Sequence, residues 1–205
     1  MKIAILGAGN VGGALAKQWA KAGHEINLGA RDRNSEKVKT LGNFSGSITA
    51  HEIKAAVDKS EVVLVSLSIP AIVQVAKSLG DLSNKIVIDA TNSVFGKPDP
   101  YKNALEAFKE ITRCNDIVKC FNTTGFENME NPVYDTKGID MFVAGKSSKA
   151  KEVAIQLSRD VGFENCYDFG GDDKVELIEQ FAMAWINLAI MQGHGRDIAF
   201  KILKR

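Results

Sequence analysis

Short runs of apolar, often β-branched residues alternate along the chain with segments in which apolar residues recur at helical spacing. Such runs predict β-strands, and the spaced segments predict helices. The predicted strands are Lys2–Leu6, Glu25–Leu28, Val62–Ser66, Ile86–Asp89, Ile117–Phe121 and Met141–Ala144, with a minor edge strand at Ser47–Thr49. The predicted helices are Val11–Ala22, Asn34–Leu41, His51–Lys59, Ile72–Leu79 and Tyr101–Ile111.

The predicted strands are continuously apolar rather than alternating, which indicates a sheet covered by helices on both faces. Strands that alternate with helices are typical of βαβ units and a parallel sheet. We therefore predict an α/β fold for residues 1–145, namely a doubly wound Rossmann domain.

Residues 146–205 differ in character and are predicted to form a small C-terminal extension. It should contain a helix at Lys149–Val161, a strand at Asn165–Phe169 and a longer helix that begins at Asp172. Between Ala182 and Met191 this helix is apolar nearly all round, so it must be enclosed or packed against another subunit. We expect the extension to cover the substrate side of the Rossmann domain and to form a homodimer.

A glycine-rich motif, Gly7-Ala8-Gly9-Asn10-Val11-Gly12, directly follows the first predicted strand and opens the first predicted helix. In that context G-x-G-x-x-G predicts a dinucleotide site. Gly7 makes the tight turn, Gly9 lets the backbone approach the pyrophosphate, and Gly12 allows close packing of helix and strand. The helix N-terminus offers N–H groups and a positive dipole end to the phosphates.

The end of the second strand indicates which dinucleotide is bound. NAD sites usually carry Asp or Glu there, but this chain has Gly29, Ala30 and Arg31. The small residues leave space, and Arg31 can pair bidentately with a 2′-phosphate while Arg33 adds a second positive charge. NADP(H) is therefore favoured. Asp32 leaves a role as ribose carboxylate open.

Three later strand ends should reach the same crevice, because ligands bind at the carboxyl ends of parallel strands. Small, hydroxyl-bearing or amide residues there permit close approach to the ribose and the nicotinamide, although turn formation alone would also explain them. The candidate cofactor-binding residues at these ends are Ser66, Leu67, Ser68, Ala90, Asn92, Asn122 and Thr123.

Composition narrows the choice of partner. With 205 residues and a formal net charge of +1, the chain offers no basic field for nucleic acid or an anionic membrane, so we expect a small-molecule substrate. Its three cysteines, Cys114, Cys120 and Cys166, form no C-x-x-C pair and indicate neither a metal site nor a dithiol centre. A short apolar N-terminus and the lack of a long apolar span predict a cytoplasmic protein.

Several motifs together resemble the coenzyme F420-dependent NADP oxidoreductases and their bacterial homologues. Besides the glycine motif, they are Gly29-Ala30-Arg31, Ile88-Asp89-Ala90-Thr91-Asn92, Lys119-Cys120-Phe121-Asn122-Thr123 and the tail Gly195-Arg196-Asp197-Ile198-Ala199-Phe200-Lys201. The resemblance implies hydride exchange between NADP(H) and a deazaflavin, coenzyme F420, bound against the C-terminal helices. The same domain resembles the NADPH-binding part of metalloreductases, which implies FMN or FAD as another acceptor.

By this resemblance, Asn10 and Val11 contact the pyrophosphate and Arg31 contacts the 2′-phosphate. Residues Ser66, Leu67, Asn122 and Thr123 would line the nicotinamide half. The family usually has Ser or Thr where this chain has Ala30, which removes one phosphate hydrogen bond and softens the preference for NADP.

Hydride transfer between a nicotinamide and a flavin-type ring depends on alignment more than on a side-chain acid or base. An alternative is an NADPH-dependent dehydrogenase of a small carbonyl or hydroxyacid, with His194 as candidate proton donor. The related hydroxyacid dehydrogenases place a lysine four residues before an asparagine, but here Met183 precedes Asn187 at that distance. The third hypothesis for the function is a non-catalytic protein that senses NADP(H).

Overall fold

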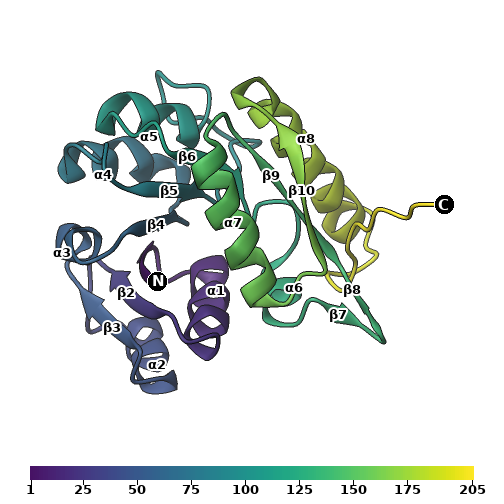
Figure 1. The fold of residues 1–205 in the computed structure, drawn as a ribbon, viewed down its shortest axis with the longest axis horizontal. Coiled ribbons are helices and arrows are strands. Elements are labelled where there is room, and N and C mark those ends of the chain that lie inside the picture. The colour runs from purple at the N-terminus through teal and green to yellow at the C-terminus, as the bar shows by residue number, and fades with distance from the viewer.

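The computed structural model describes residues 1–205 and contains one eight-stranded sheet, ordered β10-β9-β6-β5-β4-β1-β2-β3. Figure 1 shows this sheet as the centre of the molecule. Its strands are β1 (Lys2–Leu6), β2 (Glu25–Gly29), β3 (Ile48–His51), β4 (Val62–Val65), β5 (Ile86–Asp89), β6 (Ile117–Cys120), β9 (Asp140–Ala144) and β10 (Asn165–Gly170). The predicted α/β class is confirmed, and so is the position of β3 at one edge.

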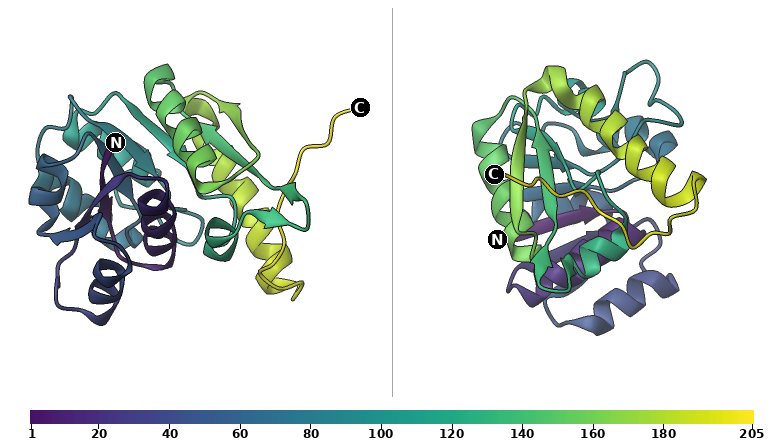
Figure 2. Two further views of the ribbon diagram at one scale, coloured as in Figure 1. Left: turned by 60° about the horizontal axis from the view of Figure 1, so that its bottom comes forward. Right: turned by 90° about the vertical axis from the view of Figure 1, so that its right-hand side faces the viewer.

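Helices cover both faces of the sheet (Figures 1 and 2). One face carries α1 (Asn10–Lys21) and α7 (Ser148–Val161), with α2 (Glu36–Phe44) and α6 (Phe126–Glu130) beside α1. The other face carries α3 (Ile53–Asp58), α4 (Ile72–Leu79), α5 (Ala104–Thr112) and α8 (Val175–Ile186). Short 3-10 turns, Ile69–Ala71 and Asp172–Lys174, precede α4 and α8.

Burial on both faces explains the continuous apolar runs of the sequence. In β1, Ile3 and Ile5 pack under α1, whereas Ala4 and Leu6 pack under the helices of the opposite face. All four side chains are fully buried. A strand that is covered on both sides has no position for a solvated polar residue, so alternation is lost.

The direction of the last two strands differs from the sequence-based expectation. Six strands run parallel, but β9 pairs antiparallel with β6, and β10 runs parallel to β9. A parallel β9 would need a crossover helix on the sheet, whereas α6 packs beside α1 instead. Helix α6 was not predicted from the sequence, and neither was the hairpin of β7 (Val133–Tyr134) and β8 (Lys137–Gly138).

The extension after residue 145 is continuous with the sheet, because β10 is its last strand and α7 covers it. The long C-terminal helix ends in a π-helical turn, Asn187–Met191. It is only partly covered: Trp185 and Ala189 are buried, but Ile190 and Met191 are each 53% exposed. After it the chain turns back, and Phe200 stacks on Phe181 with ring centroids 4.3 Å apart. None of the helices combines the length and apolar character needed to cross a membrane.

Candidate functional site: a dinucleotide cleft at the switch point of the sheet

A cleft of about 590 Å³ lies where the strand order reverses between β1 and β4. In open α/β sheets this switch point, at the carboxyl ends of the strands, is where ligands bind. Its walls are the glycine turn after β1, the turn after β2 and the loop after β4. The predicted residues that line it are Gly7, Gly9, Ala30, Arg31, Ser66, Leu67 and Ser68.

The three glycines of the motif serve different physical purposes. Gly7 has a φ of 108°, which side chains rarely allow, and a Cβ atom there would lie 2.5 Å from the Ser66 carbonyl oxygen. A Cβ atom on Gly12 would lie 2.0 Å from the Gly7 carbonyl oxygen. Nothing lies within 4 Å of the Cβ position of Gly9, so the space above this residue is open. The turn is therefore tightly packed against the chain at Gly7 and Gly12 and open to the cleft at Gly9.

Ser66 holds the glycine turn in place. Its hydroxyl reaches the carbonyl oxygens of Leu6 and Gly7, each at 3.0 Å. Its backbone N–H continues the β1–β4 ladder by donating to the Leu6 carbonyl. A serine at this strand end thus ties the loop after β4 to the turn after β1.

The N-terminus of α1 is free of side-chain caps. Gly9 is the N-cap residue, no side chain accepts from the first turn, and that turn contains no acidic residue. The first intrahelical bond is donated by Gly13 to the Gly9 carbonyl, which leaves the N–H groups of Asn10, Val11 and Gly12 without helical partners. Uncapped N–H groups and the helix dipole together favour an anion at this point.

The cations at the cleft beside the turn after β2 are Arg31 and Lys37, whereas the sequence predicted Arg31 and Arg33. Arg31 is exposed, lines the cleft and pairs with no carboxylate of the chain. Arg33 does not line the cleft, because its guanidinium is 3.2 Å from the Glu52 carboxylate. Lys37 lines the cleft instead. The sequence signal for Lys37 was its place in the first turn of α2, which packs beside the glycine turn.

Gly29 differs from its predicted role, whereas a role of Asp32 as ribose carboxylate stays an open alternative. Gly29 does not leave space for the ligand, because Leu6 and Ile53 fill the position of its missing side chain, with Leu6 Cδ2 at 2.8 Å. Asp32 lines the cleft, but one of its carboxylate oxygens accepts a hydrogen bond from the Asn34 backbone N–H at 2.9 Å. That bond forms an Asx-turn, which shapes the loop.

The ends of β5 and β6 form a buried polar layer that does not line the cleft. Asn92 donates to the Asn122 carbonyl, and the Asn122 amide donates to the Asn92 side-chain oxygen, both at 2.9 Å. Ala90, Asn122 and Thr123 are buried. Direct contact of Asn122 and Thr123 with a cofactor is therefore not supported by this geometry. Instead, these residues fix the two loops to each other.

A fully buried lysine, Lys119, lies beneath this polar layer. No function was predicted for it from the sequence. The Lys119 ammonium is 2.6 Å from the carboxylates of Asp89 and of Glu179, and it donates to the Thr91 carbonyl at 2.9 Å. Burial alone would lower the pKa of Lys119, but the two carboxylates outweigh it and raise the pKa. Burial raises the pKa of Glu179, although the Lys119 ammonium opposes this. The signal in the sequence was a lysine inside an apolar strand.

His194, the candidate proton donor, lies in the exposed turn after the π-helical turn. The backbone N–H groups of His194 and Gly195 donate to the carbonyls of Leu188 and Ala189. Gly193 and Gly195 both have positive φ angles, so the glycines serve this chain reversal. The imidazole does not line the cleft.

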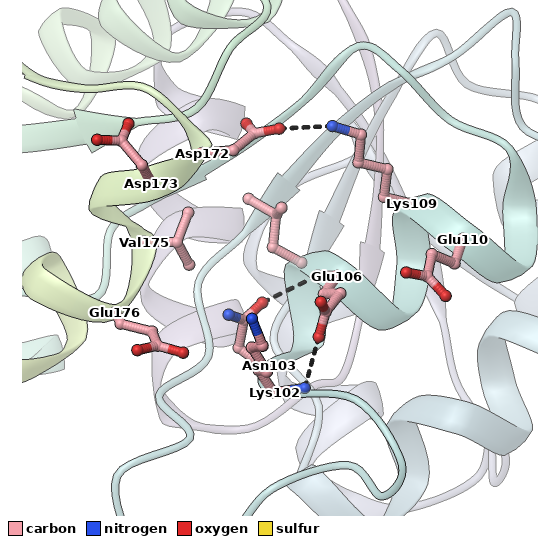
Figure 3. Close-up of a pocket in the computed structure, with 10 residues that line it drawn as sticks. Lys102, Asn103, Glu106, Lys109, Glu110, Asp172, Asp173, Val175 and Glu176 are labelled. Atoms are coloured by element: carbon pink, nitrogen blue, oxygen red, sulfur yellow. Dashed lines mark hydrogen bonds and ion pairs between the residues drawn. The ribbon is translucent and has the colours of Figure 1, made fainter.

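A second cavity, of about 480 Å³, lies between α5 and the start of α8 (Figure 3). It is lined by five carboxylates and two lysines, and Lys109 pairs with Asp172 across it. None of the predicted site residues borders it.

Comparison with known proteins supports the interpretation of the cleft. Residues 2–93, which include the glycine motif and the walls of the cleft, match the model of a family described as NADP oxidoreductase, coenzyme F420-dependent. The F420-dependent NADP reductase of Methanocaldococcus jannaschii is 28% identical over 93% of both chains. The predicted resemblance is confirmed. The chain is related to the coenzyme F420-dependent NADP oxidoreductases.

Two further comparisons concern the fold and the nucleotide-binding part of the chain. The solved structure of a candidate F420-dependent NADP reductase from Arthrobacter sp. FB24 covers 100% of both chains with a TM-score of 0.83 at 23% identity, which shows the shared fold. A glycerol-3-phosphate dehydrogenase [NAD(P)+] from Thermoanaerobacter sp. is 32% identical over 58% of the chain. The match spans only 38% of that enzyme, so the likeness to the dehydrogenase is partial.

Proposed function

We propose that this protein is an NADP(H)-dependent oxidoreductase that transfers hydride between NADP(H) and coenzyme F420. The F420-dependent NADP reductase of Methanocaldococcus jannaschii, whose name states this activity, aligns over 93% of both lengths. A second relative of the same name, from Methanothermobacter thermautotrophicus, is 25% identical over 93% of this chain. The glycerol-3-phosphate dehydrogenase relative supports only a nucleotide-binding part, because it matches over little more than half of the chain.

The observation that carries the nucleotide assignment is the uncapped N-terminus of α1 beside the open space above Gly9. A side chain on Gly9 would enter that space, and the pyrophosphate of a dinucleotide fits there because it accepts hydrogen bonds from the free N–H groups. Arg31 and Lys37 line the same cleft at the turn after β2. These two cations outnumber the single carboxylate of the turn, Asp32, and they favour a 2′-phosphate, and so NADP(H) over NAD(H).

In this assignment the nicotinamide supplies the hydride, and the residues of the chain bind and orient it. The first turn of α1 binds the pyrophosphate, and Arg31 with Lys37 fixes the 2′-phosphate. Ser66 keeps the glycine turn rigid, and Leu67 with Ser68 borders the cleft toward the nicotinamide half. A fixed geometry of donor and acceptor supplies much of the rate enhancement in such reactions.

The test is NADPH oxidation, followed by the absorbance of the reduced nicotinamide, with coenzyme F420, FMN and FAD offered separately. Turnover with coenzyme F420 well above that with either flavin supports the proposal. Faster turnover with FMN or FAD would show that the acceptor is a flavin instead. NADPH binding without turnover on any of them would contradict the assignment of a deazaflavin or flavin acceptor and favour a carbonyl substrate or an NADP(H) sensor.

We also propose a homodimer that covers the C-terminal end of the long helix. Leu188 is 38% exposed, and Ile190 and Met191 are each 53% exposed, which is a high exposure for three neighbouring apolar side chains. Light scattering after size-exclusion chromatography, on the wild type and on Ile190→Lys, tests this. A dimer that becomes a monomer in the variant is expected, and a monomeric wild type would contradict the proposal.

A further inference from the structure

The buried cluster of Lys119, Asp89 and Glu179, hereafter the charge triad, joins three elements. Asp89 is the last residue of β5, Lys119 is its pairing partner on β6, and Glu179 comes from α8. Their side chains are 1%, 0% and 6% exposed, respectively. The ammonium has carboxylate oxygens 2.6 Å away on two sides. Such a cluster is costly to bury and must be closely paired.

The charge triad does not balance its charge. Two carboxylates face one ammonium, and the remaining contact of Lys119 is the neutral Thr91 carbonyl. One Asp89 oxygen also accepts from the Thr91 backbone N–H at 2.8 Å. The cluster therefore holds an excess of about one negative charge where water is excluded, and low dielectric screening extends its reach.

The charge triad lies directly under the loops at the carboxyl ends of β5 and β6. Asp89 and Lys119 precede the mutually bonded Asn92 and Asn122 by three residues each. In a Rossmann sheet the nicotinamide half of the dinucleotide binds on the side of these later strands. The oxidised nicotinamide carries a positive charge on its ring, whereas the reduced ring is neutral.

We propose that the charge triad tunes the bound nicotinamide, favouring the cationic ring of NADP⁺ over the neutral ring of NADPH. This inference rests on the proposed function, because it requires NADP(H) in the cleft. By thermodynamic linkage, a site that binds NADP⁺ more tightly makes bound NADPH a stronger hydride donor. The three residues are thus positioning residues that act on the hydride equilibrium without touching the ring.

The experiment compares the dissociation constants of NADP⁺ and NADPH in the wild type and in Glu179→Gln. Glutamine keeps the size of the side chain and an oxygen for Lys119, but it removes the charge. For an assumed separation of about 10 Å between this charge and the ring, an effective dielectric constant of about 20 gives a change in the equilibrium of roughly tenfold. In Glu179→Gln we therefore expect the ratio of the dissociation constant of NADP⁺ to that of NADPH to rise about tenfold. For the two-electron couple this corresponds to an increase in potential of about 30 mV.

The ratio isolates the effect of charge on the ring, because the phosphates are common to both nucleotides. Glu176→Gln is the matched control: Glu176 lies on the same helix, is exposed and forms no hydrogen bond or ion pair with the charge triad, so the ratio in this variant should equal that of the wild type. Asp89→Asn provides the same test through the other carboxylate if Glu179→Gln does not fold. Thermal unfolding of each variant checks that the fold is intact.

The outcomes separate this inference from the proposed function. A wild type that binds neither nucleotide would overturn the proposed function. Normal binding with an unchanged ratio in Glu179→Gln, or equal losses for both nucleotides, would overturn only the electrostatic role of the charge triad. A ratio that also rises in Glu176→Gln would show a general surface-charge effect and would overturn it as well.

Discussion

Replacing Arg31 by alanine removes the cation that is most directly available to a 2′-phosphate. Arg31 is exposed, lines the cleft and has no carboxylate partner in the chain, so no internal ion pair must be broken when a phosphate binds. Hydrogen bonds to charged groups contribute about 1.5–3 kcal/mol each in favourable cases. Because water screens this exposed site, we take about 2 kcal/mol for the whole contact, which corresponds to a roughly thirtyfold weaker affinity for NADPH.

The assay is titration of the protein with NADPH and with NADH, followed by nucleotide fluorescence. NADH has no 2′-phosphate, so its affinity should change less than about threefold in Arg31→Ala. Arg33→Ala is the matched control, because Arg33 is two residues away and already pairs with Glu52 at 3.2 Å. An exposed pair of this kind contributes little, so this variant should bind both nucleotides nearly normally. Equal losses for NADPH and NADH in Arg31→Ala, or a larger loss of NADPH in Arg33→Ala, would refute the reasoning.

Four other perturbations follow from the same structure. Gly12→Ala places a Cβ atom 2.0 Å from the Gly7 carbonyl oxygen, so we expect the free energy of unfolding to fall by about 3 kcal/mol. Gly9→Ala should fold normally but bind NADPH at least about tenfold more weakly. Lys119→Met leaves two buried carboxylates unpaired and should destabilise the protein by about 3–5 kcal/mol in urea unfolding, with partial recovery when Glu179→Gln is added. Burial raises the pKa of Cys114 from 9.0 to about 11, so the thiol of the unfolded chain ionises first as the pH rises. The free energy of unfolding should therefore fall between pH 9 and 11. The decline should be shallower in Cys114→Ala, and an identical pH dependence of the variant would contradict this prediction.

Much of the fold followed from local patterns. Strands β1 and β5 and helix α4 have the predicted bounds, because continuous apolar runs and helical spacing are encoded residue by residue. The direction of β9 did not follow, because an apolar run such as Met141–Ala144 carries no information on its orientation. That direction depends on where α6 packs, which is a contact between distant segments.

Within the site, the sequence by itself determined the glycine turn. A motif of three glycines between strand and helix permits few other conformations, and it fixed the bounds of β1 and placed α1 to within one residue at each end. The cation at Arg31 was also predictable, since it lies two residues after the end of β2.

Only the tertiary structure decided which neighbours each polar side chain has. It paired Arg33 with Glu52, brought Lys37 to the cleft and buried Asn122 against Asn92. It also brought Glu179, sixty residues away in the sequence, to Lys119. The physical reason is that the spacing of apolar residues reports on burial, which is a property of each residue by itself. Ion pairs and hydrogen bonds depend instead on the distance between two residues, and only the folded chain sets that distance.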